Sequence, residues 1–349
     1  MEEARRIVAE WLVDGSPDII LELVGLDLTE LPELPDELTT LDCSHNQITK
    51  LPDKLPDKLV ILQCDSNQLT TLPSELPDEL TEIYCGNNQL IGLPHQLPDG
   101  LNILDCAQNQ LIELPDRLPN NLIELNCSNN RILWLSKNEL PNGLLKLSCG
   151  DNHLSEIPQL PSGLTLFGCA GNRLTRLPQL PGGLTALWCG NNQLIRLPEL
   201  PNTVDLINCK SNQLLELPRL PASLVDLFCH SNNLSELPQL PERLTILNCH
   251  YNKLSELPQL PEGLTVLNCI NNQLSELPQL PSSLTGLFCD TNRLTKLLHW
   301  PNGLIEVSCE NNPIEYPPFN MLSNRPVVSQ IRDWVQENPY NMVKSANKR

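Results

Sequence analysis

One stretch decides the fold: Leu244-Thr-Ile-Leu247-Asn-Cys249-His-Tyr-Asn252-Lys-Leu254-Ser-Glu-Leu257-Pro258. Every cysteine of the 349-residue chain occupies the same place in a copy of this pattern, and an Asn follows it three residues later each time. The cysteines stand at positions 43, 64, 85, 106, 127, 149, 169, 189, 209, 229, 249, 269, 289 and 309, so successive copies are 20 to 22 residues long. The chain is therefore an array of fourteen copies rather than two conventional domains.

The period and the frame L-x-x-L-x-C-x-x-N-x-L-x-x-L-P-x-L-P-x predict a leucine-rich repeat. Leu247 and Cys249 are two residues apart, so both face the interior from a strand, while the residues beside them face out. We expect the repeated Asn to hydrogen-bond the backbone of its own and the adjacent copy. Leu-Pro-x-Leu-Pro is expected to return the chain in extended, polyproline-like form.

One copy cannot bury its own apolar side, so the copies must stack. The sequence therefore predicts an α/β solenoid, a leucine-rich-repeat horseshoe with parallel strands on the concave side, an extended convex side and helical caps at both ends. We divide it into an N-terminal helical cap with a degenerate repeat (1–37), fourteen repeats (38–316), a C-terminal capping helix region (317–338) and a flexible tail (339–349). A longer copy at 131–143 forms a seam, and whether it bends the solenoid is left open.

The N-terminal cap has its own pattern. Residues 4–13 place Ile7, Val8, Trp11 and Leu12 at the spacing of an amphipathic helix. In the degenerate repeat that follows, Leu23 takes the Cys position and Leu26 the Asn position. A second helix is predicted near the C-terminus, over residues 326–337.

Charge and hydropathy exclude several classes. The chain has 42 acidic and 23 basic residues, a net charge of −19, which disfavours nucleic acid as a partner. No apolar run approaches the roughly 20 residues that span a bilayer, and the acidic N-terminus does not resemble a signal peptide. We therefore expect no membrane insertion and a cytoplasmic site of action, in the host cytoplasm if the protein is a secreted effector or a viral protein.

The fourteen cysteines are predicted to be structural. No C-x-x-C occurs, so a compact zinc site is disfavoured. Cysteines in one column of parallel strands point the same way rather than toward each other, which disfavours disulfides. They are expected to be small buried hydrophobes in a reducing compartment, and no metal, cofactor or catalytic residue is predicted. His230 and His250 share a column in adjacent copies; a metal pair there is conceivable, but chance occupancy is the preferred interpretation.

The array resembles the short leucine-rich repeats of bacterial type-III effectors of Yersinia, Shigella and Salmonella. The resemblance covers about residues 4–316 and rests on the L-P-x-L-P-x-x-L-x-x-L frame behind a helical cap; similar Cys-bearing arrays are known from environmental bacteria and giant viruses. It implies a protein-binding surface. Some members append a ubiquitin-ligase domain with a catalytic cysteine, but here only about 30 residues follow the last repeat and every Cys belongs to the repeat column.

Outward-facing strand residues are the expected binding surface. Residues 1–100 hold 20 acidic and 5 basic residues, and the acidic side chains Asp42, Glu82 and Asp105, with Asp65 and Glu124 beside them, either keep the protein soluble or attract a basic partner. The later copies are predicted to form an apolar lane with two histidines at its side. Its candidate partner-binding residues are Trp188, Leu206, Phe228, His230, Ile246, His250, Tyr251, Val266 and Phe288.

The sequence therefore predicts a non-enzymatic, effector-like module that binds a protein partner, with a homo-oligomer as one possibility. The alternative is an adaptor that recruits substrates to an enzyme, such as a ubiquitin ligase, supplied by another chain. An extracellular receptor is disfavoured because the signal peptide, the membrane span and Cys-rich caps are all missing.

Overall fold

The computed structural model describes residues 1–14, 20–135, 139–296 and 300–314, and the chain forms two compact units, Met1–Leu174 and Thr175–Arg349. The first unit holds α1 (Glu2–Asp14), β1 (Leu21–Glu22), β2 (Thr40–Asp42), β3 (Ile61–Gln63), β4 (Glu82–Tyr84), β5 (Ile103–Asp105), β6 (Glu124–Asn126), β7 (Lys146–Ser148) and β8 (Leu166–Gly168). The second unit holds β9 (Ala186–Trp188), β10 (Leu206–Asn208), β11 (Asp226–Phe228), β12 (Ile246–Asn248), β13 (Val266–Asn268), β14 (Gly286–Phe288) and β15 (Glu306–Ser308).

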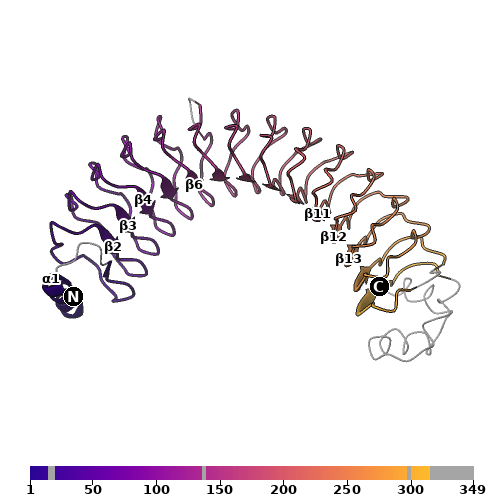
Figure 1. Cartoon of the computed structure of the whole chain (residues 1–349), viewed down its shortest axis with the longest axis horizontal. Helices are drawn as coiled ribbons and strands as arrows, with labels where there is room; N and C mark the ends of the chain where they lie inside the picture. Colours follow the sequence, from indigo (N-terminus) through magenta and orange to yellow (C-terminus); the bar gives the residue numbers. More distant parts are fainter. Residues whose placement is uncertain (15–19, 136–138, 297–299, 315–349) are drawn as a thin grey trace. The chain divides into compact units, whose positions relative to one another are not determined.

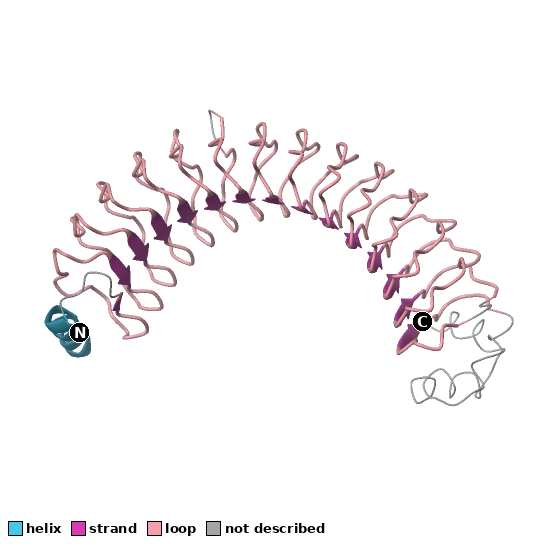
Figure 2. Cartoon of the chain, in the orientation of Figure 1, coloured by secondary structure: helices cyan, strands magenta, loops and turns pink. Residues whose placement is uncertain are grey.

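Within each unit the strands are parallel and stand in chain order. They lie side by side along one edge of the stacked coils, and loops fill the opposite edge (Figures 1 and 2). The register repeats from copy to copy, so that Leu247 of β12 pairs with Leu227 of β11 and Leu267 of β13. The predicted leucine-rich-repeat solenoid is confirmed.

The apolar columns fill the space between the two edges. In the copy that contains β12, Leu244, Leu247, Cys249 and Leu254 are fully buried, and Leu257 is 8% exposed. Burying one such leucine contributes roughly 1.5–3 kcal/mol, and only the neighbouring copies can provide that burial. All fourteen cysteines are free and buried in the same column, as predicted. Burial raises the pKa of the Cys43 thiol to about 12, so these thiols are poor nucleophiles.

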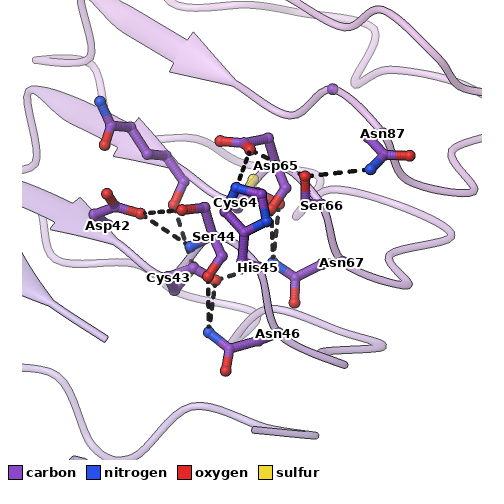
Figure 3. A network of polar contacts seen from close by, with 12 residues as sticks. Asp42, Cys43, Ser44, His45, Asn46, Cys64, Asp65, Ser66, Asn67 and Asn87 are labelled. Carbon is purple, nitrogen blue, oxygen red and sulfur yellow. Dashed lines mark hydrogen bonds and ion pairs between the residues drawn. The ribbon is translucent and has the colours of Figure 1, made fainter. Parts of the chain in front are cut away.

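The asparagine column connects successive copies. Asn67 Nδ2 donates to Cys43 O in the preceding copy at 2.9 Å and to Cys64 O in its own copy at 3.2 Å. Its Oδ1 accepts from Ile48 N at 2.9 Å (Figure 3 shows Asn67 at this turn). One buried amide therefore satisfies backbone groups that the sharp turn leaves outside the sheet, which confirms the predicted ladder.

The residue two after each cysteine has a left-handed backbone, which the pattern did not predict. Its φ is +67° at Gly171 and lies between +50° and +57° at the other residues of this column. Asn and Asp, which tolerate this conformation, are frequent there, but Ser66, Tyr251 and Thr291 adopt it too. These residues are held by backbone hydrogen bonds to the next copy, such as Tyr251 N to Ile270 O at 2.8 Å.

The N-terminal cap has the predicted helix with a different buried face. Ala4, Val8 and Trp11 are buried in α1, whereas Leu12 is 57% exposed. At about 100° per residue, Leu12 lies at the edge of the stripe that the other three define, so that part of the prediction was wrong. No described helix is of a length and hydropathy to cross a membrane.

The degenerate repeat is part of the ladder. Leu23 is fully buried in the Cys position, and its carbonyl accepts from Asn46 Nδ2 at 2.7 Å. Leu26, in the Asn position, instead donates its N–H to Asn46 Oδ1 at 2.9 Å. The predicted C-terminal helix and the tail lie outside the described residues, as do residues 136–138 of the seam.

Candidate functional site

The first and third residues of β2 to β14 form the sheet face of each unit. They flank a buried middle residue, and in most of these strands both are half-buried. Apart from α1, which contacts β1, the described strands have only neighbouring strands as close contacts among the helices and strands of their unit.

On the sheet face of the first unit, Asp42, Glu82 and Asp105 occupy such outward positions. Two of them also hold the turn that follows their strand. Asp42 Oδ1 accepts from Ser44 N at 3.0 Å and from Ser44 Oγ at 2.7 Å (Figure 3). Asp105 Oδ1 accepts from Ala107 N at 3.0 Å. These two carboxylates therefore have a structural role that the sequence analysis did not assign.

Asn can replace Asp in this role. In the same position of β6, Asn126 Oδ1 accepts from Ser128 N at 3.3 Å, and Asn268 of β13 accepts from Ile270 N at 3.3 Å. The negative charge at Asp42 and Asp105 is therefore not needed for the turn.

A small hollow lies on the first unit between the ends of three successive strands and their turns. Its volume is about 300 Å³, and its lining includes Asp65, Tyr84, Gly86 and Asp105. Burial raises the pKa of the Asp65 carboxyl above its ordinary value. The sequence analysis had singled out the acidic residues but missed Tyr84 and Gly86, because the hollow forms only when copies about 20 residues apart are stacked.

On the sheet face of the second unit, the apolar residues are interrupted by polar ones. Trp188 and Phe228 are both in register with Asn208, which lies between them. Asp226 lies between Leu206 and Ile246 in the same way. The predicted lane is therefore a mixed surface in which apolar and polar side chains share the same strands.

The C-terminal part of this face is more continuous. Ile246 and Val266 are in register on adjacent strands. The next position is Gly286, and a Cβ built there would lie 3.3 Å from Phe288 Cε2 and 3.7 Å from Val266 Cγ1. The Phe288 ring and the Val266 side chain therefore both border the space that a side chain at position 286 would take.

His230 and His250 are direct neighbours, as their shared column predicts. Their rings stack with centroids 4.1 Å apart and an interplanar angle of 11°, and Tyr251 packs edge-on against His250 at 5.2 Å. Burial, then the neighbouring His250 and Lys210, lowers the pKa of His230 to about 4. Nearly parallel rings keep their nitrogen lone pairs in separate planes rather than aiming them at one ion, which favours a stacked neutral pair over a chelate.

The solved structures most informative for this chain are those of YopM. YopM from Yersinia pestis, a leucine-rich effector protein, is 36% identical over 91% of this chain and 90% of that chain, with a TM-score of 0.82. YopM from Yersinia enterocolitica WA-314 is 35% identical over 91% of this chain and 74% of that chain, with a TM-score of 0.79. The chain belongs to this family of leucine-rich-repeat effector proteins. The resemblance found in the sequence is thus confirmed.

A second likeness concerns the cysteine column. The functional domain of InlJ from Listeria monocytogenes, which includes a cysteine ladder, is 25% identical over 84% of this chain and 73% of that chain, with a TM-score of 0.65. The chain matches no protein-family model and no curated protein sequence.

Proposed function

We propose that the chain is a non-enzymatic, effector-like interaction module that binds a protein partner on the sheet faces of its units. The observation that carries the proposal is a sheet face with half-buried aromatic side chains on which no strand or helix packs among the described residues of the second unit. Aromatic residues in such positions are the usual centres of binding energy. The buried, weakly acidic thiols offer no nucleophile, and fourteen free thiols suit the reducing cytoplasm.

The second unit is proposed as the main contact. Trp188, Phe228 and Phe288 are the large aromatic side chains among the third strand residues of that unit, in a protein with only 4% aromatic residues. Each ring is partly accessible, so a partner would complete its burial. The proposed partner contacts are therefore these rings together with Leu206, Ile246, Val266 and the residues of the histidine stack.

The test is affinity capture from eukaryotic-cell lysate, with cross-linking mass spectrometry to identify the partner and the contact residues. The Trp188→Ala/Phe228→Ala variant is expected to lose the captured partner while its thermal unfolding midpoint changes little. Ile195→Ala/Leu215→Ala is the matched control, because both residues belong to the same unit and are more than half exposed outside the strands. A double aromatic variant that still captures the partner refutes this proposal, and a second copy or ligase subunits among the cross-linked proteins would identify self-association or the adaptor role.

A further inference from the structure

We propose that the hollow on the first unit receives an arginine side chain of a protein partner. This inference rests on the proposed function, in that it specifies what the sheet face of this unit recognises. The hollow is lined by Asp65, Ser66, Tyr84, Gly86, Asn87, Asp105, Ala107, Gln108 and Asn126.

The repeat pattern explains why the hollow exists. The position directly after the cysteine holds Asp65, Gly86 and Ala107 in three successive copies. A Cβ at Gly86 would lie 3.3 Å from Ala107 O and 3.4 Å from Asp105 Oδ1, so a longer side chain there would project into the same space. The equivalent position holds Lys210 and His230 in the second unit. A Gly followed by an Ala in this column therefore leaves room that longer side chains, such as Lys210 and His230, fill in their own copies.

The hollow is negatively charged and contains no compensating cation. In the described part of the chain, Asp65, Glu82 and Asp105 form no ion pair with a Lys or Arg. Asp65 Oδ2 accepts from Ser66 Oγ at 3.3 Å and lies 4.0 Å from His45 Nε2. By contrast, Glu124 on β6 pairs with Lys146 on the next strand at 2.9 Å. Two of these uncompensated carboxylates, Asp65 and Asp105, line the hollow.

The carboxylates near the hollow also affect the Tyr84 side chain. Its Oη donates to Glu82 Oε2 at 2.9 Å, which holds the side chain in place. Burial, then this hydrogen bond and the charges of Glu82, Glu124 and Asp105, raises the pKa of the Tyr84 phenol to about 12. The ring thus remains neutral and adds an aromatic surface to a negatively charged pocket, a combination that favours a cation.

The arrangement fits a guanidinium better than an ammonium. The Asp105 carboxylate is fixed before any ligand arrives, because Oδ1 accepts from Ala107 N and Oδ2 accepts from Asn126 Nδ2, both at 3.0 Å. A planar guanidinium can hydrogen-bond a fixed carboxylate and stack on an aromatic ring at the same time, whereas an ammonium is a point charge that keeps its water. The chemistry therefore selects arginine among basic side chains.

The experiment uses the full chain labelled with ¹⁵N and titrated at low salt with the blocked tripeptide acetyl-Gly-Arg-Gly-amide. We expect the largest shifts at the amides of Gly86, Asn87 and Ala107, weaker binding of the lysine tripeptide, and no binding of the citrulline tripeptide, which lacks the charge. Equal shifts with citrulline, or shifts centred outside the hollow, would overturn the inference.

Two variants test the assignment to these residues. The double variant Asp65→Asn/Asp105→Asn should weaken binding of the arginine tripeptide by at least about tenfold, because each of the two substitutions removes a charge-assisted contact. The fold should survive, because Asn126 already makes the turn contact at the position equivalent to Asp105. The control Glu30→Gln/Glu33→Gln removes the same charge from exposed residues of the same unit and should bind normally.

Gly86→Lys supplies an internal cation and should abolish tripeptide binding. Lys210 shows that the column accepts this side chain. Unchanged affinity in both hollow variants would refute the inference. Because the probe is a tripeptide and the variants lie in the first unit, this result is independent of partner capture by the second unit, and either proposal can fail alone.

Discussion

Replacing Asn252 with alanine is expected to lower the free energy of unfolding of the second unit by about 3 kcal/mol. Asn252 is only 9% exposed. Its Oδ1 accepts from Leu234 N at 3.0 Å, and its Nδ2 donates to Cys229 O at 3.1 Å and to Cys249 O at 3.0 Å. Without the amide, Leu234 N and Cys229 O in the preceding copy each lose a hydrogen bond.

The magnitude follows from the cost of leaving such groups unsatisfied. Leu234 N would be left without its hydrogen bond, which costs about 1–3 kcal/mol. Cys229 O and Cys249 O would each lose one of two hydrogen bonds, since they still accept from Asn232 Nδ2 and Asn272 Nδ2, and each loss costs about 0.5–1.5 kcal/mol. The total is about 2–6 kcal/mol. The lower half of this range is expected, because the residue is near enough to the surface for a water molecule to replace part of the amide. The isosteric Asn252→Asp variant keeps the acceptor for Leu234 N but loses the donor, and should also be destabilised.

Urea unfolding followed by circular dichroism gives the loss in stability, and native-state hydrogen exchange shows where it occurs. Exchange should accelerate first in the copies of β11 and β12, because stability in a repeat array depends on nearest neighbours. Asn202→Ala changes the same residue type at an exposed turn of the same unit and should cost less than about 0.5 kcal/mol. If Asn252→Ala were as stable as Asn202→Ala, the ladder would not be a source of stability.

Three further results are expected. Denatured protein should titrate fourteen thiols with a thiol reagent and native protein few, since all are buried; rapid labelling of most native thiols would contradict this. Gly171→Ala should cost at least about 1 kcal/mol, because φ is +67° there and the new Cβ would overlap Asp151 Oδ1 and lie 2.9 Å from Asp151 Cγ, so that the Asp151 side chain must move. Gly92→Ala, with nothing within 4 Å, should be nearly neutral in urea unfolding. The pKa of His230 falls from 6.5 to about 4 on folding. The stability that neutral His230 contributes is therefore present above pH 6.5 and is lost as the pH falls toward 4. His230→Gln should make the unfolding midpoint depend less on pH between these two values.

The buried columns could be predicted because each depends on one local rule. Leu247 and Cys249 must share a face since strand side chains alternate, and a 20-residue period then places every copy in register. The asparagine ladder follows from the need to satisfy the turn's backbone groups. The left-handed position directly before each ladder asparagine could not be predicted in the same way. Its residues range from Gly171 to Tyr251, so no single side-chain type identifies it.

The sheet faces were harder to predict because two demands share one position. The third strand residue faces outward, where a partner is proposed to bind, but where it is Asp or Asn it can also accept from the backbone two residues later, as Asp105 and Asn268 do. A run of such residues is therefore part structural and part functional, and composition alone does not separate the two. What separates them is charge: Asn suffices for the turn, so the carboxylates of the first unit are available for a selective role, and Asp105 lines the hollow beside Tyr84 together with Asp65.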